Sequence, residues 1–459
     1  MKPLKRRQMP LYALAGFGPN LLNTILSIYL VDALQTAGFV KNVENWTFFN
    51  KTVIAVVLFS VLKFIAQLVD GIIDVPFAAL TDNLKSKWGK RRPTILIGTI
   101  PMLLSYVAFL FPANIENSVW NSIYCGFLLL IFFSAYTLSM VTYYGTYSEV
   151  TENEKERFFL SNFKAFIDTI QYALAYALIP VFIGFANIRW IGLAAAPLGL
   201  TILIAVFMIK ENSSLPGAEP KYPEVAPSDE EEVPIAESVK LTFKNKDFMA
   251  WAVVLSIFFF GLQMFLSGQN VLASGPMGLE GWQIAVINTA AFAPVPLMLA
   301  IYRAIMKKKG FRFAFQTALA AFALGMISFS VAYVEWIPSV WARLGIGAAG
   351  GTIASYGIGA FLSAPYLVPA ELAAQDFERT GKRRSAMFFA IQGLFTAAVG
   401  AISTGLVWPN LRNVSVNGNE LAGTHMMPYI AAAACVAAII AAFFMPKMYN
   451  ELGKKEKDE

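Results

Sequence analysis

Four polar residues recur at helical spacing inside one long apolar stretch, residues 52–82. They are Lys63, Gln67, Asp70 and Asp74, with spacings of four, three and four. At 3.6 residues per turn, residues with these spacings share one stripe of a helix. If the stretch crosses a membrane, each charge costs at least ~2.5 kcal/mol at the helix centre. The stripe is therefore expected to face protein or a water-filled cavity rather than lipid.

Asp70 and Asp74 predict a site for a positive charge. Two carboxylates one helical turn apart repel each other unless a cation or a proton neutralises them. Binding of Na⁺ or H⁺ would then change which conformation of a carrier is stable. The alternative is a structural pair held by basic residues of neighbouring helices. Because ionisable residues in spans are functional by default, we favour the coupling site. Apart from a Na⁺ ion at these acids, no metal or organic cofactor is expected.

Three further charges lie in apolar stretches. Lys63 precedes Asp70 by seven residues, or roughly 10 Å along the axis, so a direct ion pair within the helix is doubtful. It either snorkels outward or pairs within the cavity. Lys164 and Asp168 are four residues apart in the fifth apolar stretch. They either pair across one turn, or Lys164 snorkels to the cytoplasmic surface.

The whole chain has the composition of a polytopic membrane protein. Of its 459 residues, 57% are hydrophobic and 14% are charged, whereas soluble proteins carry about 25% charged residues. Many apolar runs exceed the roughly 20 residues that cross a bilayer, and they predict about twelve helical spans. The expected spans cover residues 10–34, 52–82, 94–112, 121–148, 160–186, 190–209, 248–273, 282–306, 313–333, 339–373, 385–407 and 426–446.

Lysine and arginine are distributed unevenly between the loops. Of 36 in total, two lie inside spans, and 29 lie in the N-terminal segment, alternate loops, the central linker and the C-terminal tail. This bias predicts a multi-pass protein of the inner or plasma membrane with both termini in the cytoplasm. Basic clusters next to spans argue for the lipid bilayer, and against nucleic acid, as the partner. The five cations expected outside are Lys41, Lys51, Arg189, Arg343 and Arg412.

Residues 210–246 divide the chain into two halves. They contain five prolines and the acidic run 229–232, and such a composition cannot bury enough apolar surface to fold alone. We expect an acidic, proline-rich cytoplasmic linker between six-helix bundles at 1–209 and 247–446, followed by a cytoplasmic tail at 447–459. Two matched halves with a substrate site between them are the plan of a major facilitator, here expected to be a monomer.

Several motifs resemble a known family. Asp70-Gly-Ile-Ile-Asp74 is followed fourteen residues later by Trp88-Gly89-Lys90-Arg91-Arg92-Pro93. The end of the fourth span, residues 143–149, and the acidic-then-basic stretch 371–384 agree with the same pattern. Together they resemble the glycoside–pentoside–hexuronide:cation symporters, the melibiose permease-like members of the major facilitator superfamily. The resemblance implies an all-α major facilitator fold that carries a sugar or glycoside with H⁺ or Na⁺ by alternating access.

The resemblance also assigns roles to individual residues. The cation-coupling residues would be Asp70, Asp74 and Thr137. The substrate-binding residues would be Asn20, Asp70, Asp74, Tyr144 and Lys164, with Tyr144 at the position of an aromatic ring that stacks on a sugar. Auxiliary charged or polar positions are Lys63, Gln67 and Asp168.

Some positions depart from the family pattern. Met140 stands where the melibiose permease has a third cation carboxylate, Gln67 where an arginine is usual, and Ala397 where that permease has a lysine. Losing one of three acids weakens the case for Na⁺ more than for H⁺, because a proton needs one acceptor. Asp168 is a candidate for the missing charge, and uncoupled transport is also open.

Charged loops on the cytoplasmic side predict a gate. Arg91 and Arg92 are expected to pair with Asp82, or with acids such as Glu149, when that side is shut. Arg383 belongs to the corresponding basic stretch of the second half. The same basic residues also serve the positive-inside bias.

Two other functions compete with sugar symport. One is a major facilitator carrier of a non-sugar solute such as an amphipathic lipid. The other is a sugar sensor that kept the fold and does not transport. An enzyme is not expected, because the chain has no H-E-x-x-H or G-x-S-x-G motif and no paired Cys/His ligands.

Overall fold

The computed structural model describes residues 2–147, 150–151, 154–219, 221–222, 235–380 and 385–454. In this part of the chain the regular elements are all helical, with two isolated bridges beside them. The described residues contain twelve helical stretches long and apolar enough to cross a membrane. The predicted all-α fold is confirmed, and the span boundaries differ from the predicted ones by a few residues at most ends. Of the expected gate and site residues, Glu149 and Arg383 and the side chains of Asp74 and Asp82 lie outside the described part.

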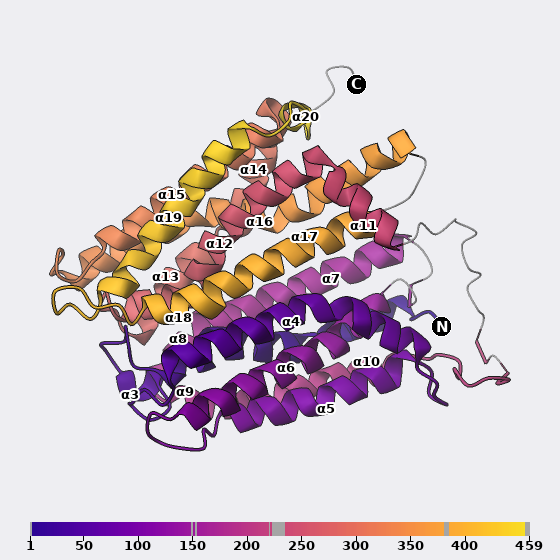
Figure 1. The fold of residues 1–459 in the computed structure, drawn as a ribbon, viewed down its shortest axis with the longest axis horizontal. Coiled ribbons are helices and arrows are strands. Elements are labelled where there is room, and N and C mark those ends of the chain that lie inside the picture. The colour runs from indigo at the N-terminus through magenta and orange to yellow at the C-terminus, as the bar shows by residue number, and fades with distance from the viewer. Residues whose placement is uncertain are drawn as a thin grey trace. The chain divides into compact units, whose positions relative to one another are not determined.

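Packing divides the chain into two compact units, drawn in Figure 1. Unit 1 comprises Met1–Thr36 and Asn42–Asp229, and unit 2 comprises Ala37–Lys41 and Glu230–Glu459. The α-helices of unit 1 are α1 Met9–Leu14, α2 Phe17–Ile25, α3 Val43–Trp46, α4 Val56–Asn83, α5 Arg91–Phe109, α6 Val119–Gly145, α7 Glu154–Ala173, α8 Ile179–Ile183, α9 Ile188–Ala195 and α10 Leu203–Met208.

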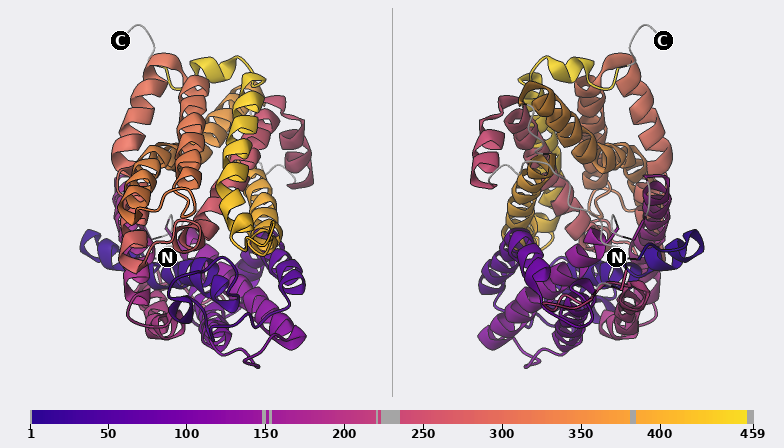
Figure 2. Two further views of the ribbon diagram at one scale, coloured as in Figure 1. Left: turned by 90° about the vertical axis from the view of Figure 1, so that its left-hand side faces the viewer. Right: turned by 90° about the vertical axis from the view of Figure 1, so that its right-hand side faces the viewer.

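Unit 2 is likewise a helical bundle, and Figure 2 shows each unit from two further sides. Its core is rich in aromatic rings: Phe258 on α12 packs edge-on against Phe315 and Phe322 of α15. The α-helices of unit 2 are α11 Ile235–Lys244, α12 Lys246–Ser274, α13 Gly281–Phe292, α14 Val295–Lys309, α15 Phe311–Val331, α16 Val340–Thr380, α17 Ser385–Gly400, α18 Trp408–Leu411, α19 Ala422–Phe443 and α20 Met448–Glu451.

Polar side chains fix where the long helices begin. The Ser118 hydroxyl accepts from the backbone N–H of Trp120 at the start of α6. The Asn245 side chain accepts from the N–H groups of Asp247 and Phe248 at the start of α12. Such caps satisfy backbone donors that have no partner within the helix. α6 carries several of the polar residues discussed below.

The five cations expected outside all have partners in the loops. Arg343 donates to the backbone oxygens of Met277, Ile337 and Pro338 at 2.5–2.7 Å, and Arg189 lies over three aromatic rings. The other three contact an acid or a backbone oxygen: Lys41 contacts Glu280, Lys51 contacts Glu116, and Arg412 contacts the Ala37 carbonyl. The buried Arg343 and Arg412 are therefore structural residues, whereas the exposed ion pairs of Lys41 and Lys51 stabilise little.

Candidate substrate and coupling site

The polar stripe of α4 faces protein. Lys63 is 1% exposed and Asp70 is half-buried, whereas Val57 and Ile72, at other angles around the helix, are 70% and 54% exposed. A lysine that snorkelled outward would expose its ammonium group, so the burial of Lys63 favours the interior alternative. Gln67 is half-buried on the same stripe.

Asp70 contacts the neighbouring helix α6. The Thr137 hydroxyl donates a hydrogen bond to Asp70 Oδ1 at 2.5 Å, and Thr137 itself is 6% exposed. A buried hydroxyl beside a carboxylate presents two oxygens to one small volume. Such a pair can hold a proton on Asp70 or offer two ligands to a monovalent cation.

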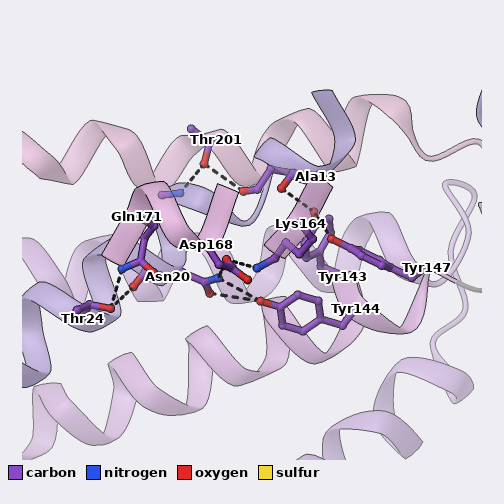
Figure 3. Close-up of polar contacts among 12 residues, drawn as sticks. Ala13, Asn20, Thr24, Tyr143, Tyr144, Tyr147, Lys164, Asp168, Gln171 and Thr201 are labelled. Atoms are coloured by element: carbon purple, nitrogen blue, oxygen red, sulfur yellow. Dashed lines mark hydrogen bonds and ion pairs between the residues drawn. The ribbon is translucent and has the colours of Figure 1, made fainter. Parts of the chain in front are cut away.

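Asn20 of α2 is the centre of a second polar group, shown in Figure 3. Its Oδ1 accepts from the Tyr136 hydroxyl at 2.9 Å. Its Nδ2 lies 3.2 Å from the Tyr144 hydroxyl and 3.4 Å from Asp168 Oδ1. One amide thus connects α2 with α6 and α7, and its orientation is fixed by both its oxygen and its nitrogen.

Lys164 completes this group. It forms an ion pair with Asp168 on the same helix, α7, and the Lys164 side chain is 9% exposed against 31% for Asp168. Its Nζ lies 5.3 Å from the centroid of the Tyr144 ring, within the range of a cation–π interaction. The Tyr144 ring is 40% exposed and keeps surface for another molecule. Of the two alternatives left open for Lys164, the structure shows the ion pair with Asp168.

Three tyrosines in the second half of α6 and one just after its end divide into two pairs. Tyr136 and Tyr144 reach Asn20, as described above. Tyr143 is fully buried and donates to the Tyr12 backbone oxygen at 2.7 Å, and Tyr147 donates to the Tyr143 hydroxyl at 2.9 Å. The second pair therefore joins α6 to α1 and packs the bundle, whereas the first pair belongs to the polar group.

Met140 occupies an apolar position beside this group. It is 2% exposed, and its methyl carbon would lie 3.3 Å from a Cβ added at Gly16. The aliphatic part of Lys164 packs against the same glycine. Met140 is part of a cluster of buried apolar side chains, so an acid at this position would be largely removed from water.

The basic motif after α4 has an acidic partner that sequence reasoning missed. The Glu211 carboxylate accepts from the backbone N–H groups of Lys90, Arg91 and Arg92 at 3.0, 3.1 and 2.9 Å, at the start of α5. Gly89 has a φ of +87°, and a Cβ there would lie 2.1 Å from Glu211. The motif thus needs glycine at position 89. The backbone N–H groups of the motif bind Glu211 and so hold the segment that follows α10. The predicted partners Asp82 and Glu149 fall outside the described part.

Two further buried groups were not singled out from the sequence. Asp32, near the end of the first span, is 3% exposed; an acid inside an apolar run was the available signal. Gln171 of α7 is 2% exposed and donates to the Thr24 hydroxyl of α2 at 2.9 Å. Both lie in unit 1, where the described site residues also lie.

Comparison with known proteins decides the family. Residues 11–446 match the family described as MFS/sugar transport protein. The chain belongs to this family. With twelve potential spans in the described residues, it is a multi-pass membrane transporter and not an enzyme. The motif resemblance to sugar symporters and the expected major facilitator fold are confirmed.

Individual relatives of this transporter match it over part of its length. It is 30% identical over 158 residues to a protein named uncharacterized symporter sll1374 of Synechocystis sp., covering 33% of this chain and 26% of that one. It is 25% identical over 177 residues to the lactose permease of Lactobacillus helveticus, covering 38% and 27%. The matched stretches thus span about a quarter of each relative.

Solved structures match over nearly the whole transporter. The crystal structure of a D-xylose–proton symporter superposes with a TM-score of 0.63 and 15% identity, covering 98% of this chain and 99% of that one. At this identity the likeness shows the fold alone.

Proposed function

We propose that this transporter is a cation-coupled symporter of a sugar or glycoside that works by alternating access. The observation that carries the proposal is the adjacency of two polar groups on α6. Thr137 contacts the Asp70 carboxylate, and the preceding residue, Tyr136, contacts Asn20. Consecutive residues of α6 therefore contact a carboxylate suited to a cation and an amide suited to hydroxyl groups.

The contact between Asp70 and Thr137 supplies a route for coupling. While Asp70 is ionised, the Thr137 hydroxyl donates to it. Once Asp70 binds a proton or a cation, that hydrogen bond is weakened or must reverse, because a protonated acid donates and a cation takes the oxygen lone pairs. A shift of Thr137 is passed to Tyr136 and hence to Asn20. Asp74, one turn further along α4, is proposed to share this role.

The group around Asn20 fits a neutral, hydroxylated substrate. Lys164 and Asp168 balance each other's charge, so the group carries no excess charge for an anionic or cationic cargo. A sugar hydroxyl can donate to Asp168 and accept from Lys164 or Asn20. The half-exposed Tyr144 ring can stack on the C–H face of a sugar ring. The name of one relative, a lactose permease, supports the same substrate class, and that of the other, a symporter, supports coupled transport.

The charge bias of the loops supports a position in the inner or plasma membrane with both termini in the cytoplasm. The transporter is proposed to act as a monomer. The gate is proposed to use Arg91 and Arg92 together with Asp82, Glu149 and Arg383. Within the described residues, Arg92 Nε donates to the Val206 backbone oxygen at 2.8 Å, so this side chain also holds α5 to α10.

Reconstituted vesicles test the proposal. Lactose and other labelled glycosides are offered with an imposed proton gradient, an imposed sodium gradient, or neither. We expect at least one glycoside to accumulate in the vesicles when one of the two cation gradients is imposed. The same glycoside should exchange across the membrane when neither gradient is present. Exchange without accumulation would remove the coupling part of the proposal. Transport of a lipid or another non-sugar solute, with no glycoside transported or bound, would overturn the substrate class, and glycoside binding without exchange would indicate a sensor.

A further inference from the structure

Arg189 of unit 1 carries a guanidinium group that aromatic rings hold in place. It is the second residue of α9, and its guanidinium carbon lies 5.0, 4.5 and 5.3 Å from the ring centroids of Phe49, Phe111 and Trp190. Among the residues that the structure describes, no oxygen accepts a hydrogen bond from this side chain, and its Nε is buried without a partner. Arginine stays charged and carries five N–H donors, so the group needs an acceptor.

Other arginines of the transporter find their acceptors in the backbone. Arg343 donates to three carbonyl oxygens at 2.5–2.7 Å, and Arg92 Nε donates to the Val206 oxygen at 2.8 Å. At Arg189 the described surroundings supply ring faces, which attract a cation but do not replace the hydrogen bonds that it makes in water. The acceptor for this group is therefore expected from outside the chain.

The polar side chain next to Arg189 is already engaged. Asn187 Oδ1 accepts from the backbone N–H of Arg189 at 2.8 Å, and Asn187 Nδ2 donates to the carbonyl oxygens of Glu44 and Thr47 at 2.6 and 2.7 Å. These contacts fix the start of α9 beside α3, at one end of unit 1 (Figure 1). The position of Arg189 is thus set by packing.

The depth of Arg189 in the bundle indicates which acceptor is within reach. One potential span, Ile188–Met208, begins beside it, and another, Arg91–Phe109, ends two residues before its ring partner Phe111. Span ends lie near the polar headgroups that flank the ~30 Å hydrocarbon core of a bilayer. The adjacent surface is apolar, because Phe185 is 85% and Trp190 is 55% exposed, and exposed aromatic rings are typical of a membrane interface.

A single guanidinium matches a single negative charge. Lys51, in the same loop as Phe49, lies 3.8 Å from Glu116 and adds no net charge to the site. A phosphodiester carries one negative charge, whereas a phosphate monoester carries nearly two at neutral pH. The planar guanidinium can also donate to two oxygens of one phosphate group. Charge and geometry therefore favour the phosphodiester of a phospholipid over a free phosphate ion.

We propose that Arg189 and the three rings around it bind the phosphate group of a membrane phospholipid. The terminal nitrogens of the guanidinium donate to the phosphate oxygens, and the exposed Trp190 and Phe185 contact the glycerol and the acyl chains. Such a lipid joins the start of α9 to the end of α5 and the loop before α4. The site lies in unit 1 alone and does not depend on the proposed transport of a sugar.

Native mass spectrometry of the purified protein in a neutral detergent tests this site. The protein is titrated with dioleoylphosphatidylglycerol, or with dioleoylglycerol, which has the same chains and no phosphate. We expect the tightest-bound phosphatidylglycerol to be held at least about tenfold more weakly by Arg189→Gln, because this variant loses a charge-assisted hydrogen-bond donor. Lys51→Gln is the matched control, since it removes an exposed cation of the same region, and it should bind as the wild type does.

Three outcomes would overturn the proposal. The first is equal phosphatidylglycerol binding by folded Arg189→Gln and the wild type. The second is wild-type protein that retains dioleoylglycerol as well as phosphatidylglycerol, a result that needs no variant to fold. The third is displacement of the lipid by an equal concentration of inorganic phosphate, which would indicate a site for a free anion. If the glutamine variant does not fold, Arg189→Lys replaces it and should bind at least about threefold more weakly than the wild type, because lysine lacks the planar fork.

Discussion

Replacing Asn20 by alanine should weaken sugar binding strongly. The change removes side-chain contacts at 2.9, 3.2 and 3.4 Å, to Tyr136, Tyr144 and Asp168. In the proposed complex Asn20 also donates to a sugar hydroxyl, and its contacts with Tyr144 and Asp168 hold those groups for the sugar. A hydrogen bond contributes about 0.5–1.5 kcal/mol. Losing the bond to the sugar together with this positioning is expected to weaken binding by about 1.4–2.5 kcal/mol, or roughly 10- to 60-fold in Kd.

Titration calorimetry of the purified protein, with the glycoside selected by the vesicle screen, measures this loss. Thr24→Val is the matched control, because it removes the 2.9 Å contacts of the Thr24 hydroxyl with Gln171 and with the Asn20 backbone carbonyl but leaves the Asn20 side chain in place. Its Kd should stay within about twofold of the wild-type value. A folded Asn20→Ala protein with wild-type Kd would refute the role of Asn20. An equal loss in Thr24→Val would show a general effect on α2 instead.

Three further predictions concern neighbouring residues. Tyr144→Ala should raise the Kd for the glycoside by roughly fivefold, because a stacked ring contributes about 1 kcal/mol; an unchanged binding isotherm would remove Tyr144 from the site. Lys164→Gln should lower the free energy of unfolding by about 1–3 kcal/mol, because it leaves the charge of Asp168 unbalanced. Adding Asp168→Asn should restore part of this stability. Denaturant unfolding that finds the double variant less stable than the single one would contradict the prediction. Glu211→Ala should destabilise unit 1 by about 1–2 kcal/mol through loss of the acceptor at the start of α5; thermal unfolding should show no such loss for the exposed Glu219→Ala.

The helices and the polar stripe of α4 were predictable from local sequence. Apolar runs set the spans, and the spacing of Lys63, Gln67 and Asp70 placed them on one side of a helix, because helical geometry depends on neighbours in sequence. The pairing of Lys164 with Asp168 followed from the same geometry. The family resemblance supplied Asn20, Thr137 and Tyr144 as candidates but none of their contacts.

The contacts between distant segments could not be predicted. Asn20 and Tyr136 are 116 residues apart, Arg92 and Glu211 are 119 apart, and Ala37 and Arg412 are 375 apart. Each depends on how helices pack and not on local periodicity. The partition of the α6 tyrosines is of the same kind, because only packing shows which hydroxyl reaches Asn20. The partners proposed for Arg91 and Arg92 stay a prediction, since Asp82 and Glu149 lie outside the described part.

The coupling role of Asp70 is tested most directly by comparing two rates in one vesicle preparation. Asp70→Asn should lose cation-driven glycoside accumulation by at least about tenfold, because an amide cannot take up a proton or a charge at neutral pH. Gradient-free exchange should persist, and Glu116→Gln, which changes an exposed loop acid, should keep both activities. Accumulation at the wild-type level by Asp70→Asn would contradict the proposal that this carboxylate couples the cation to the sugar.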